Sequence, residues 1–209
     1  MLSANAIISL HNHLTHTWHL DPESTEAHPL VAEPPSAFLH RVALQHRANF
    51  DLWHIEDEAR APGATDTRLA DVKRRIDRTN QLRNDLAEDL DRALLEWLDP
   101  HHLPTPNAPL HSESPGLMID RLSILDLKIF HTRQEAERTG APSGHAERNR
   151  SRLAILQEQR TDLAACLDML WQEVLAGSRR FKLYRQLKMY NDPSLNPAIY
   201  RNLLDEPAP

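Results

Sequence analysis

The fold of this chain is decided by residues 114–130, which have the sequence SPGLMIDRLSILDLKIF. A serine followed by a proline is a typical helix start, because the serine can cap the first turn and the proline already has a helical backbone angle. The apolar residues that follow cover almost the whole circumference of a helix, and a helix of this kind is buried on all sides. The sequence therefore predicts a central helix from residue 115 to about residue 139.

Similar start and stop signals predict further helices on both sides of the central one. The chain has 32 Leu, 9 Ile and 4 Val, and this predominance of leucine over β-branched residues favours helices over strands. The predicted helices cover residues 4–19, 36–60, 66–98, 145–176 and 178–190. We predict an all-α fold, which is an antiparallel bundle of four long helices with a short N-terminal helix and a basic C-terminal helix.

Composition divides the chain into three parts. Residues 1–36 hold a histidine-rich helix and an acidic, proline-rich linker, residues 37–204 hold the helical bundle as a single domain, and residues 205–209 form a frayed tail.

The overall charge and the cysteine content exclude several classes of protein. A formal net charge of -6 argues against a general nucleic-acid binder, which needs a basic face. The single cysteine, Cys166, excludes an intrachain disulfide and a multi-cysteine zinc site. No apolar run reaches the roughly 18–20 residues that span a bilayer, and no Lys or Arg precedes Arg41, although a secretory signal requires a basic start. We therefore expect a cytoplasmic protein without a membrane span, and the sequence indicates no particular cofactor.

Two segments of the long helices resemble each other. Residues 83–91, RNDLAEDLD, and residues 160–168, RTDLAACLD, agree at six of nine positions. The bundle is therefore either two copies of one helical hairpin or a chance match between leucine-rich helices. In both segments an arginine, Arg83 or Arg160, interrupts an apolar face and needs a carboxylate or an anionic ligand. We favour an internal ion pair, and an anion-binding cavity is the alternative.

Polar residues that accompany the predicted core define a candidate site. Glu56, Asp57 and Asp120 are the candidates for acid–base catalysis, since partial burial moves the pKa of a carboxyl group towards neutral pH. Arg83 and Arg121 are candidate deep cations. The other ligand-binding candidates within the helices are Trp53, Asn84 and Lys128.

The most basic stretch, residues 179–193, interleaves cations with aromatic residues, a pattern that suits a phosphate next to a ring or sugar. Lys182, Arg185, Lys188, Tyr190 and Asn191 are its candidate ligand-binding residues. A basic helix that docks on the acidic body is the alternative interpretation.

Two possible metal sites carry weaker signals, and we assign no metal ligands. One would use carboxylates of adjacent helices, as in helical nucleotide pyrophosphohydrolases, and its residues would be Glu56, Asp57, Glu88 and Asp91. The other would use histidines near the N-terminus, namely His11, His13, His16, His19 and His28. A solvated or ion-paired acidic face, and a polar face on a peripheral helix, are the favoured interpretations.

Four motifs in a fixed order resemble a bacterial family of unknown function, the one numbered 4254. They are NFxLWxxEDxAR at residues 49–60, VKRxIDxxNQxRND at 72–85, SExPGxMIDRLSIL at 112–125 and FKxYxQxKMYNDPxLNP at 181–197. The resemblance covers about residues 38–200. It implies no established activity, but a loose association with gene neighbourhoods for lipopolysaccharide and other surface glycans. Asp126 departs from the small residue or threonine expected at its position, and its burial would conflict with the predicted packing of the central helix.

Taken together, these features favour a protein that binds, and in one version acts on, a phosphorylated small molecule such as a sugar nucleotide in surface-glycan biosynthesis. One alternative is a non-catalytic protein that docks on glycan-assembly enzymes. The other is a metal-dependent phosphohydrolase.

Overall fold

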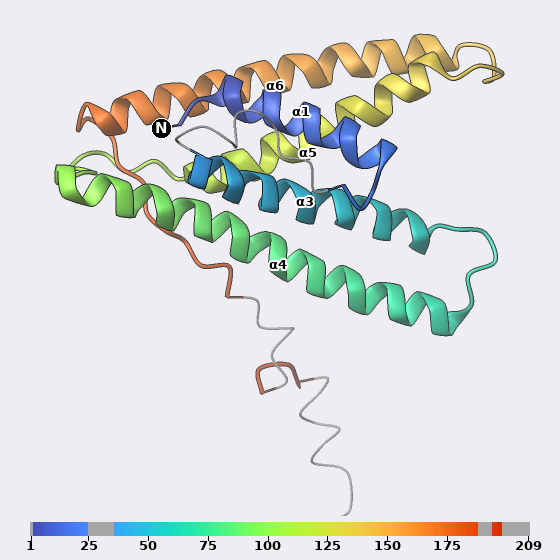
Figure 1. The fold of residues 1–209 in the computed structure, drawn as a ribbon, viewed down its shortest axis with the longest axis horizontal. Coiled ribbons are helices and arrows are strands. Elements are labelled where there is room, and N and C mark those ends of the chain that lie inside the picture. The colour runs from blue at the N-terminus through green and yellow to red at the C-terminus, as the bar shows by residue number, and fades with distance from the viewer. Residues whose placement is uncertain (1, 25–35, 188–193, 198–209) are drawn as a thin grey trace, which may run out of the picture.

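The computed structural model describes residues 2–24, 36–187 and 194–197. Throughout these ranges the regular elements are helices, as predicted, and they form an all-α bundle (Figure 1). The helices are α1 (Ala4–Leu20), α3 (Ser36–Ala59), α4 (Asp66–Leu98), α5 (Pro115–Glu137) and α6 (His145–Leu175), with a short 3-10 helix, η1 (Asp99–His101), after α4. The predicted limits of all five long helices agree with these to within two residues.

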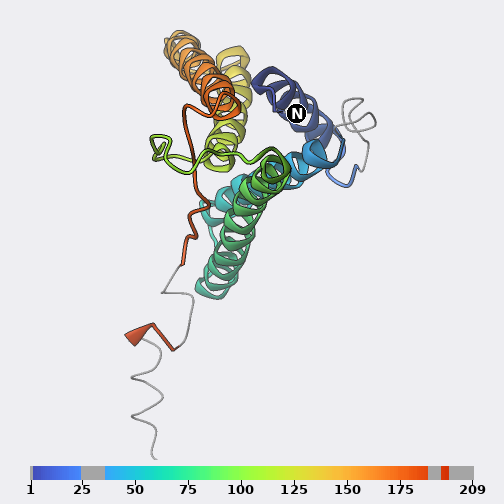
Figure 2. The same cartoon turned by 90° about the vertical axis from the view of Figure 1, so that its left-hand side faces the viewer.

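The bundle consists of two helical hairpins with a fifth helix laid across both. Helices α3 and α4 form one hairpin and α5 and α6 the other, and α1 lies between them (Figures 1 and 2). Helix α5 packs against all four other long helices, which confirms its predicted central position. None of the helices in the described ranges is both long and apolar enough to cross a membrane.

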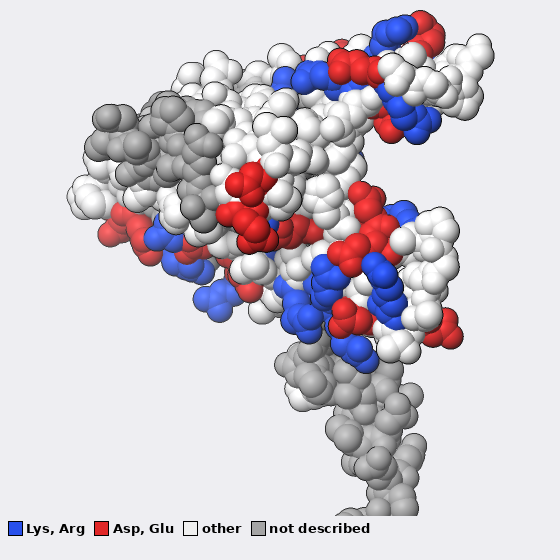
Figure 3. Space-filling model, turned by 45° about the vertical axis from the view of Figure 1, so that its right-hand side comes forward, with Lys and Arg blue, Asp and Glu red and all other residues white. Residues whose placement is uncertain are grey.

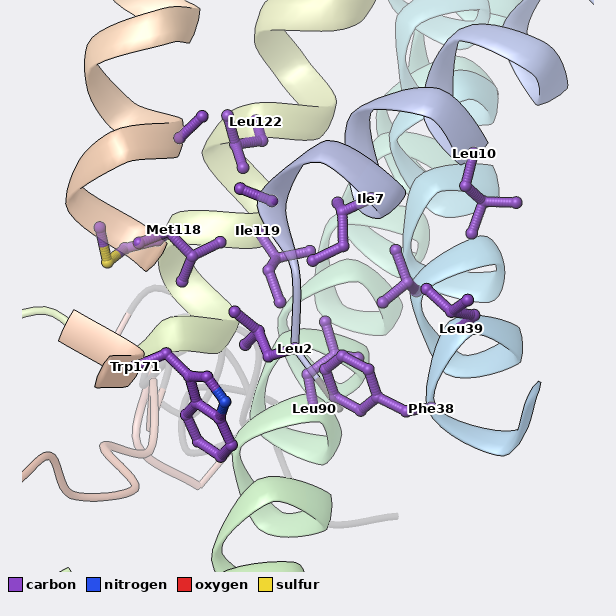
Figure 4. Packing of buried hydrophobic residues seen from close by; sticks show 14 of the residues in the cluster. Leu2, Ile7, Leu10, Phe38, Leu39, Leu90, Met118, Ile119, Leu122 and Trp171 are labelled. Carbon is purple, nitrogen blue, oxygen red and sulfur yellow. The ribbon is translucent and has the colours of Figure 1, made fainter. Parts of the chain in front are cut away.

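Helix α1 belongs to the core of the bundle. Its apolar face, formed by Ile7, Leu10, Leu14 and Trp18, is buried. Figure 4 shows Ile7 next to Ile119 of α5. The expectation that residues 4–19 form a peripheral helix is therefore wrong, because this helix covers apolar surface of both hairpins. The domain boundary near residue 36 stays a prediction.

Two aspartates on α5 are buried among these apolar residues. Asp120 is 4% exposed and Asp126 is 1% exposed. Asp126 accepts a hydrogen bond from Arg160 Nη1 at 2.6 Å, and its other oxygen lies 3.2 Å from His11 Nδ1. Because partners on α1 and α6 satisfy this carboxylate, its burial does not conflict with the central position of α5, contrary to the expectation from sequence.

The predicted basic helix at 178–190 is wrong over residues 178–187, which are not helical. Helix α6 ends before Gly177, whose φ is +71°, and the chain then runs alongside the α4–α5 connection. The Arg180 amide donates to Pro109 O at 3.0 Å, and the His111 amide donates to Arg180 O at 2.8 Å. These bonds and the buried ring of Phe181 hold the segment extended. Residues 188–190 lie outside the described ranges.

Helices α4 and α5 approach each other closely at Gly116. Asp91 of α4 accepts hydrogen bonds from the Gly116 amide, at 2.7 Å, and from the hydroxyl of Ser114, and so caps the start of α5. A β-carbon on Gly116 would lie 2.3 Å from Ala87 O and 2.9 Å from the Asp91 carboxylate. Both neighbours are held in α4, so only glycine fits here.

We expect Gly116→Ala to lower the free energy of unfolding by about 2–3 kcal/mol, the range for overpacking a core. Helix propensity alone predicts a gain of about 1 kcal/mol for the same change. Urea denaturation followed by circular dichroism measures the difference. A variant as stable as the parent would contradict the close approach of the two helices.

The Asp91 carboxyl should make stability depend on pH. Burial raises its pKa from 3.8 to about 6, against the opposite effect of its bonds to Ser114 and Gly116. Between about pH 4 and pH 6 the folded chain therefore retains a proton that the unfolded chain has lost, and the contribution of Asp91 to stability falls as the pH rises.

In Asp91→Asn this contribution is absent. The free energy of unfolding of the parent, taken relative to the variant, should therefore fall by up to about 3 kcal/mol between pH 4 and pH 6.5. Urea denaturation of both proteins across this range measures it. Parallel pH profiles would show that Asp91 is ionised in the folded protein at pH 4.

Candidate functional site

Asp120 is the centre of a buried polar network between α3, α4 and α5. It accepts hydrogen bonds from Arg83 Nε at 3.0 Å and Nη2 at 2.9 Å, from Asn49 Nδ2 at 2.9 Å and from Gln45 Nε2 at 2.5 Å. The Asp120 side chain is 6% exposed and that of Arg83 is 25% exposed. The carboxylate is thus fully satisfied inside the bundle, and Arg83 connects it to the surface.

The network continues from Asn49 towards α1. Asn49 Nδ2 donates to Ser123 Oγ at 2.9 Å, Ser123 Oγ lies 2.7 Å from His46 Nδ1, and His46 Nε2 lies 2.9 Å from Thr15 Oγ1. The imidazoles of His46 and His11 stack with their centroids 4.3 Å apart. Burial, and then the charge of His11, lower the pKa of His46 well below its usual value. His46 is therefore neutral at pH 7 and serves the packing of α1.

Arg83 and Arg160 both form ion pairs with aspartates of α5. Arg83 pairs with Asp120 at 2.9 Å and Arg160 pairs with Asp126 at 2.6 Å. The favoured sequence interpretation, an internal ion pair, is confirmed for both. The two arginines occupy matching positions in the two similar segments, and each has the same structural role, which is an ion pair with a buried aspartate of α5.

An open cleft lies where the two hairpins diverge. It consists of two hollows, of about 360 and 440 Å³, and Trp53 lines both of them. Figure 3 shows this face of the molecule hollowed between the far ends of the hairpins, with charged side chains on both walls. Six predicted site residues lie in or directly behind the cleft: Trp53, Glu56, Asp57, Asp120, Arg83 and Lys128.

The two walls of the cleft differ in charge. On α3, Glu56 pairs with Arg60 at 3.0 Å, while Asp57 is exposed. On the opposite wall, Lys128 of α5 and Arg152 of α6 line the larger hollow, and neither forms an ion pair with any described residue. Arg152 only donates to the amide oxygen of Asn149, at 3.3 Å. The α5–α6 wall therefore offers unpaired positive charge.

The other predicted ligand-binding residues lie elsewhere. Arg121 is exposed and pairs with Glu113 at 2.8 Å, and Asn84 is buried in α4. Lys182 and Arg185 are exposed on the segment after α6 and line none of the hollows at Trp53. Lys188, Tyr190 and Asn191 lie outside the described ranges. Sequence analysis did not identify Arg152, because nothing in the sequence distinguishes it from the other charged residues at the start of α6.

The four acids considered for a divalent cation are not brought together. Glu56 and Asp57 line the cleft, but Asp91 caps α5 and Glu88 accepts a hydrogen bond from the Gln186 amide at 2.8 Å. The only group in the described ranges with three candidate metal ligands close together consists of histidines instead.

These histidines are His19 of α1, His54 of α3 and His131 of α5, and one nitrogen of each lies within 4.8 Å of the others. Burial, and then the charges of His19 and His54, lower the pKa of His131 to about 4. Burial also lowers the pKa of His19. Both shifts favour the neutral imidazole of His19 and His131, which is the form that binds a metal ion.

The predicted polar face is thus wrong for two of the N-terminal histidines. His11 is fully buried and His19 faces α3 and α5. Sequence analysis did not identify His54 and His131 as candidate metal ligands, because they lie far apart in the sequence and do not form a known metal-binding motif. His28 lies outside the described ranges.

Comparison with known proteins identifies a family but no characterised relative. A family model described as "Protein of unknown function (DUF4254)" matches residues 39–183. No curated protein and no solved structure matches the chain significantly. The match contains both hairpins and most of the cleft, and it begins after α1.

The ion pair between Arg83 and Asp120 is testable by a double-mutant cycle. Arg83→Met should lower the free energy of unfolding by about 3 kcal/mol, because it leaves a buried carboxylate without its cation. Adding Asp120→Asn removes that charge, so the double variant should be at least about 1 kcal/mol more stable than the sum of the single effects implies. Urea denaturation supplies all four values.

Arg121→Met is the matched control, since its ion pair with Glu113 is exposed and should contribute less than about 1 kcal/mol. Strictly additive effects of the two substitutions would contradict a direct pair between Arg83 and Asp120.

Proposed function

The chain belongs to the DUF4254 family of proteins of unknown function, and we propose that it binds a small phosphorylated molecule, such as a sugar nucleotide, in the cleft around Trp53. The observation that carries the proposal is the arrangement of charge about this residue. Lys128 and Arg152, without ion-pair partners among the described residues, line the larger hollow, where the carboxylate of Glu135 is paired with Arg138 and His145. Hydrogen-bond acceptors line the smaller hollow, where Arg60 and Arg83 are paired with Glu56 and Asp120. Trp53 joins the two hollows.

The phosphate would bind in the larger hollow. Lys128 and Arg152 provide positive charge there, and the side-chain amides of Asn149 and Gln159 line the same hollow. A guanidinium can hold a phosphate through two parallel hydrogen bonds, and an ammonium acts as a point charge. Arg152 bonds only to an amide oxygen, so it can turn to a ligand without breaking an ion pair.

The sugar or base would bind in the smaller hollow. Trp53 offers apolar surface to a ring, and the carboxylates of Glu56 and Asp57 and the amide of Asn49 can bond to hydroxyl groups. The two hollows, about 360 and 440 Å³, fall in the size range of small-molecule sites. A ligand with a polar ring at one end and a phosphate at the other matches this division.

The internal position of Arg83 changes its role from that expected. Its charge is already matched by Asp120, so we assign it to shaping the wall of the cleft rather than to holding phosphate. If the ligand is chemically changed, Glu56 and Asp57 are the acid–base candidates that border the ring. The proposal includes a cytoplasmic location, as expected from the sequence. It also includes a place in surface-glycan biosynthesis, which the family resemblance suggests.

We expect a phosphorylated ligand to raise the melting temperature of the protein. A panel of sugar nucleotides, hexose phosphates and their unphosphorylated counterparts, followed by calorimetry of the best binder, supplies the affinities. Arg152→Met and Lys128→Met should each weaken binding of the phosphorylated ligand about tenfold or more, which corresponds to about 1.4 kcal/mol. Binding of the unphosphorylated counterpart should be weaker and insensitive to both changes.

Arg150→Met is the control, because it removes the same charge from the same helix at an exposed position that pairs with Glu147. A panel without any thermal shift would overturn the proposal and favour the docking protein, whose partner would then be sought by co-purification. Equal losses in Arg150→Met and Arg152→Met would show that only the general charge of α6 matters.

A further inference from the structure

We propose that His19, His54 and His131 form a binding site for one divalent transition-metal ion of the Zn²⁺ type. The three side chains come from α1, α3 and α5, and a nitrogen from each lies within 4.8 Å of the other two. The ring centroids are 5.2 Å apart for His19 and His54, 5.0 Å for His19 and His131, and 6.0 Å for His54 and His131. This inference rests on these residues and not on the proposed ligand of the cleft.

The hydrogen bonding of His19 prepares it to bind a metal. Its Nδ1 lies 2.7 Å from the carbonyl oxygen of Thr15, and a carbonyl only accepts, so Nδ1 carries the proton. The lone pair is then on Nε2. A backbone carbonyl bonded to the far nitrogen is the usual second partner of a metal-binding histidine, because it fixes the tautomer and orients the ring.

Two of the candidate ligand atoms are buried without a partner. Neither Nε2 of His19 nor Nε2 of His131 makes a hydrogen bond with any described residue, although both atoms are inaccessible to solvent. A buried polar atom left unpaired costs about 1–3 kcal/mol. Both atoms belong to the same cluster, and a metal ion between them would satisfy both.

The dimensions of the cluster are close to those of a metal site. Zn–N bonds of about 2.0–2.1 Å in a tetrahedral site place the nitrogens roughly 3.3 Å apart. The present separation of up to 4.8 Å closes to this value if each ring moves inward by about 1 Å. Rotation of the imidazoles about their side-chain bonds provides such a movement without displacing a helix.

Aromatic rings enclose the cluster. Trp53 stacks on His131 with centroids 4.6 Å apart and an interplanar angle of 6°, and Phe130 lies 4.2 Å from His19. Phe50 contacts both His19 and His54. An apolar shell of this kind limits the access of water and strengthens the interaction of a cation with its ligands.

Three histidines leave the fourth tetrahedral position to a water molecule or to an oxygen of another ligand, as in catalytic zinc sites. His19 and His54 line a hollow of about 550 Å³ between α1, α3 and α4, while His131 lines the cleft next to Lys128. The cluster thus lies between two hollows at the surface of the bundle.

The test uses the full chain without an affinity tag, stripped with a chelator and titrated with Zn²⁺ or Co²⁺ alone. We expect one ion per chain by calorimetry, a rise of more than about 5 °C in melting temperature at a hundredfold excess over Kd, and the strong visible absorption of tetrahedral Co²⁺. His54→Gln and His131→Gln should each reduce affinity beyond the roughly 10- to 100-fold loss typical of outer-shell residues.

His40→Gln is the matched control, because His40 is exposed on α3. It should bind Zn²⁺ like the parent, and so should Arg152→Met, which separates this test from that of the phosphorylated ligand. The metal-free His131→Gln variant loses the stack of this ring on Trp53, which contributes about 0.5–1.5 kcal/mol. Its melting temperature should therefore lie no more than about 6 °C below that of the metal-free parent.

Three results would overturn the inference. The first is the absence of Zn²⁺ binding to the parent. The second is unchanged binding in His54→Gln and His131→Gln, and the third is an equal loss of affinity in His40→Gln. A large fall in the melting temperature of metal-free His131→Gln would instead assign the cluster to the packing of the bundle.

Discussion

The bundle depends on two aspartates that are buried in its central helix. A carboxylate in an apolar interior is tolerated only when hydrogen-bond donors and a cation surround it. The donors to Asp120 come from α3 and α4, and those to Asp126 come from α1 and α6. Since each donor must reach a fixed position on α5, the two carboxylates set the register of all four surrounding helices. Apolar contacts alone would permit several registers.

The same constraint explains where a ligand can bind. Among the described residues, the two guanidinium groups that reach the buried aspartates of α5, those of Arg83 and Arg160, are each used by an ion pair. At the far ends of the two hairpins, where these diverge, Lys128 and Arg152 line a hollow. Neither of these two cations has a carboxylate partner among the described residues. The unpaired positive charge on which the proposed ligand site depends is thus at the open end of the bundle.

Sequence reasoning predicted what depends on neighbouring residues and missed what depends on packing. Proline, glycine and capping residues act within one turn, so the helix limits were predictable. An arginine in an apolar face needs a counter-charge wherever it lies, so the ion pairs of Arg83 and Arg160 were predictable too. The extended path of residues 178–187 depends on hydrogen bonds to Pro109 and His111. These distant bonds cannot be predicted from the spacing of apolar residues within the segment itself. Likewise, His54 and His131 become neighbours only once α3 and α5 are in register.

Helix α1 shows how far the site depends on elements outside the recognised family region. The family match covers residues 39–183, yet α1 supplies His11 to Asp126 and His19 to the histidine cluster. Without α1, Asp126 would keep only Arg160 as a partner, and the cluster would be reduced to two imidazoles open to water. Two histidines hold a divalent ion far less well than three, because the remaining coordination must come from water. The metal site we infer is therefore a property of the complete helical assembly, created when α1 closes over the gap between the two hairpins.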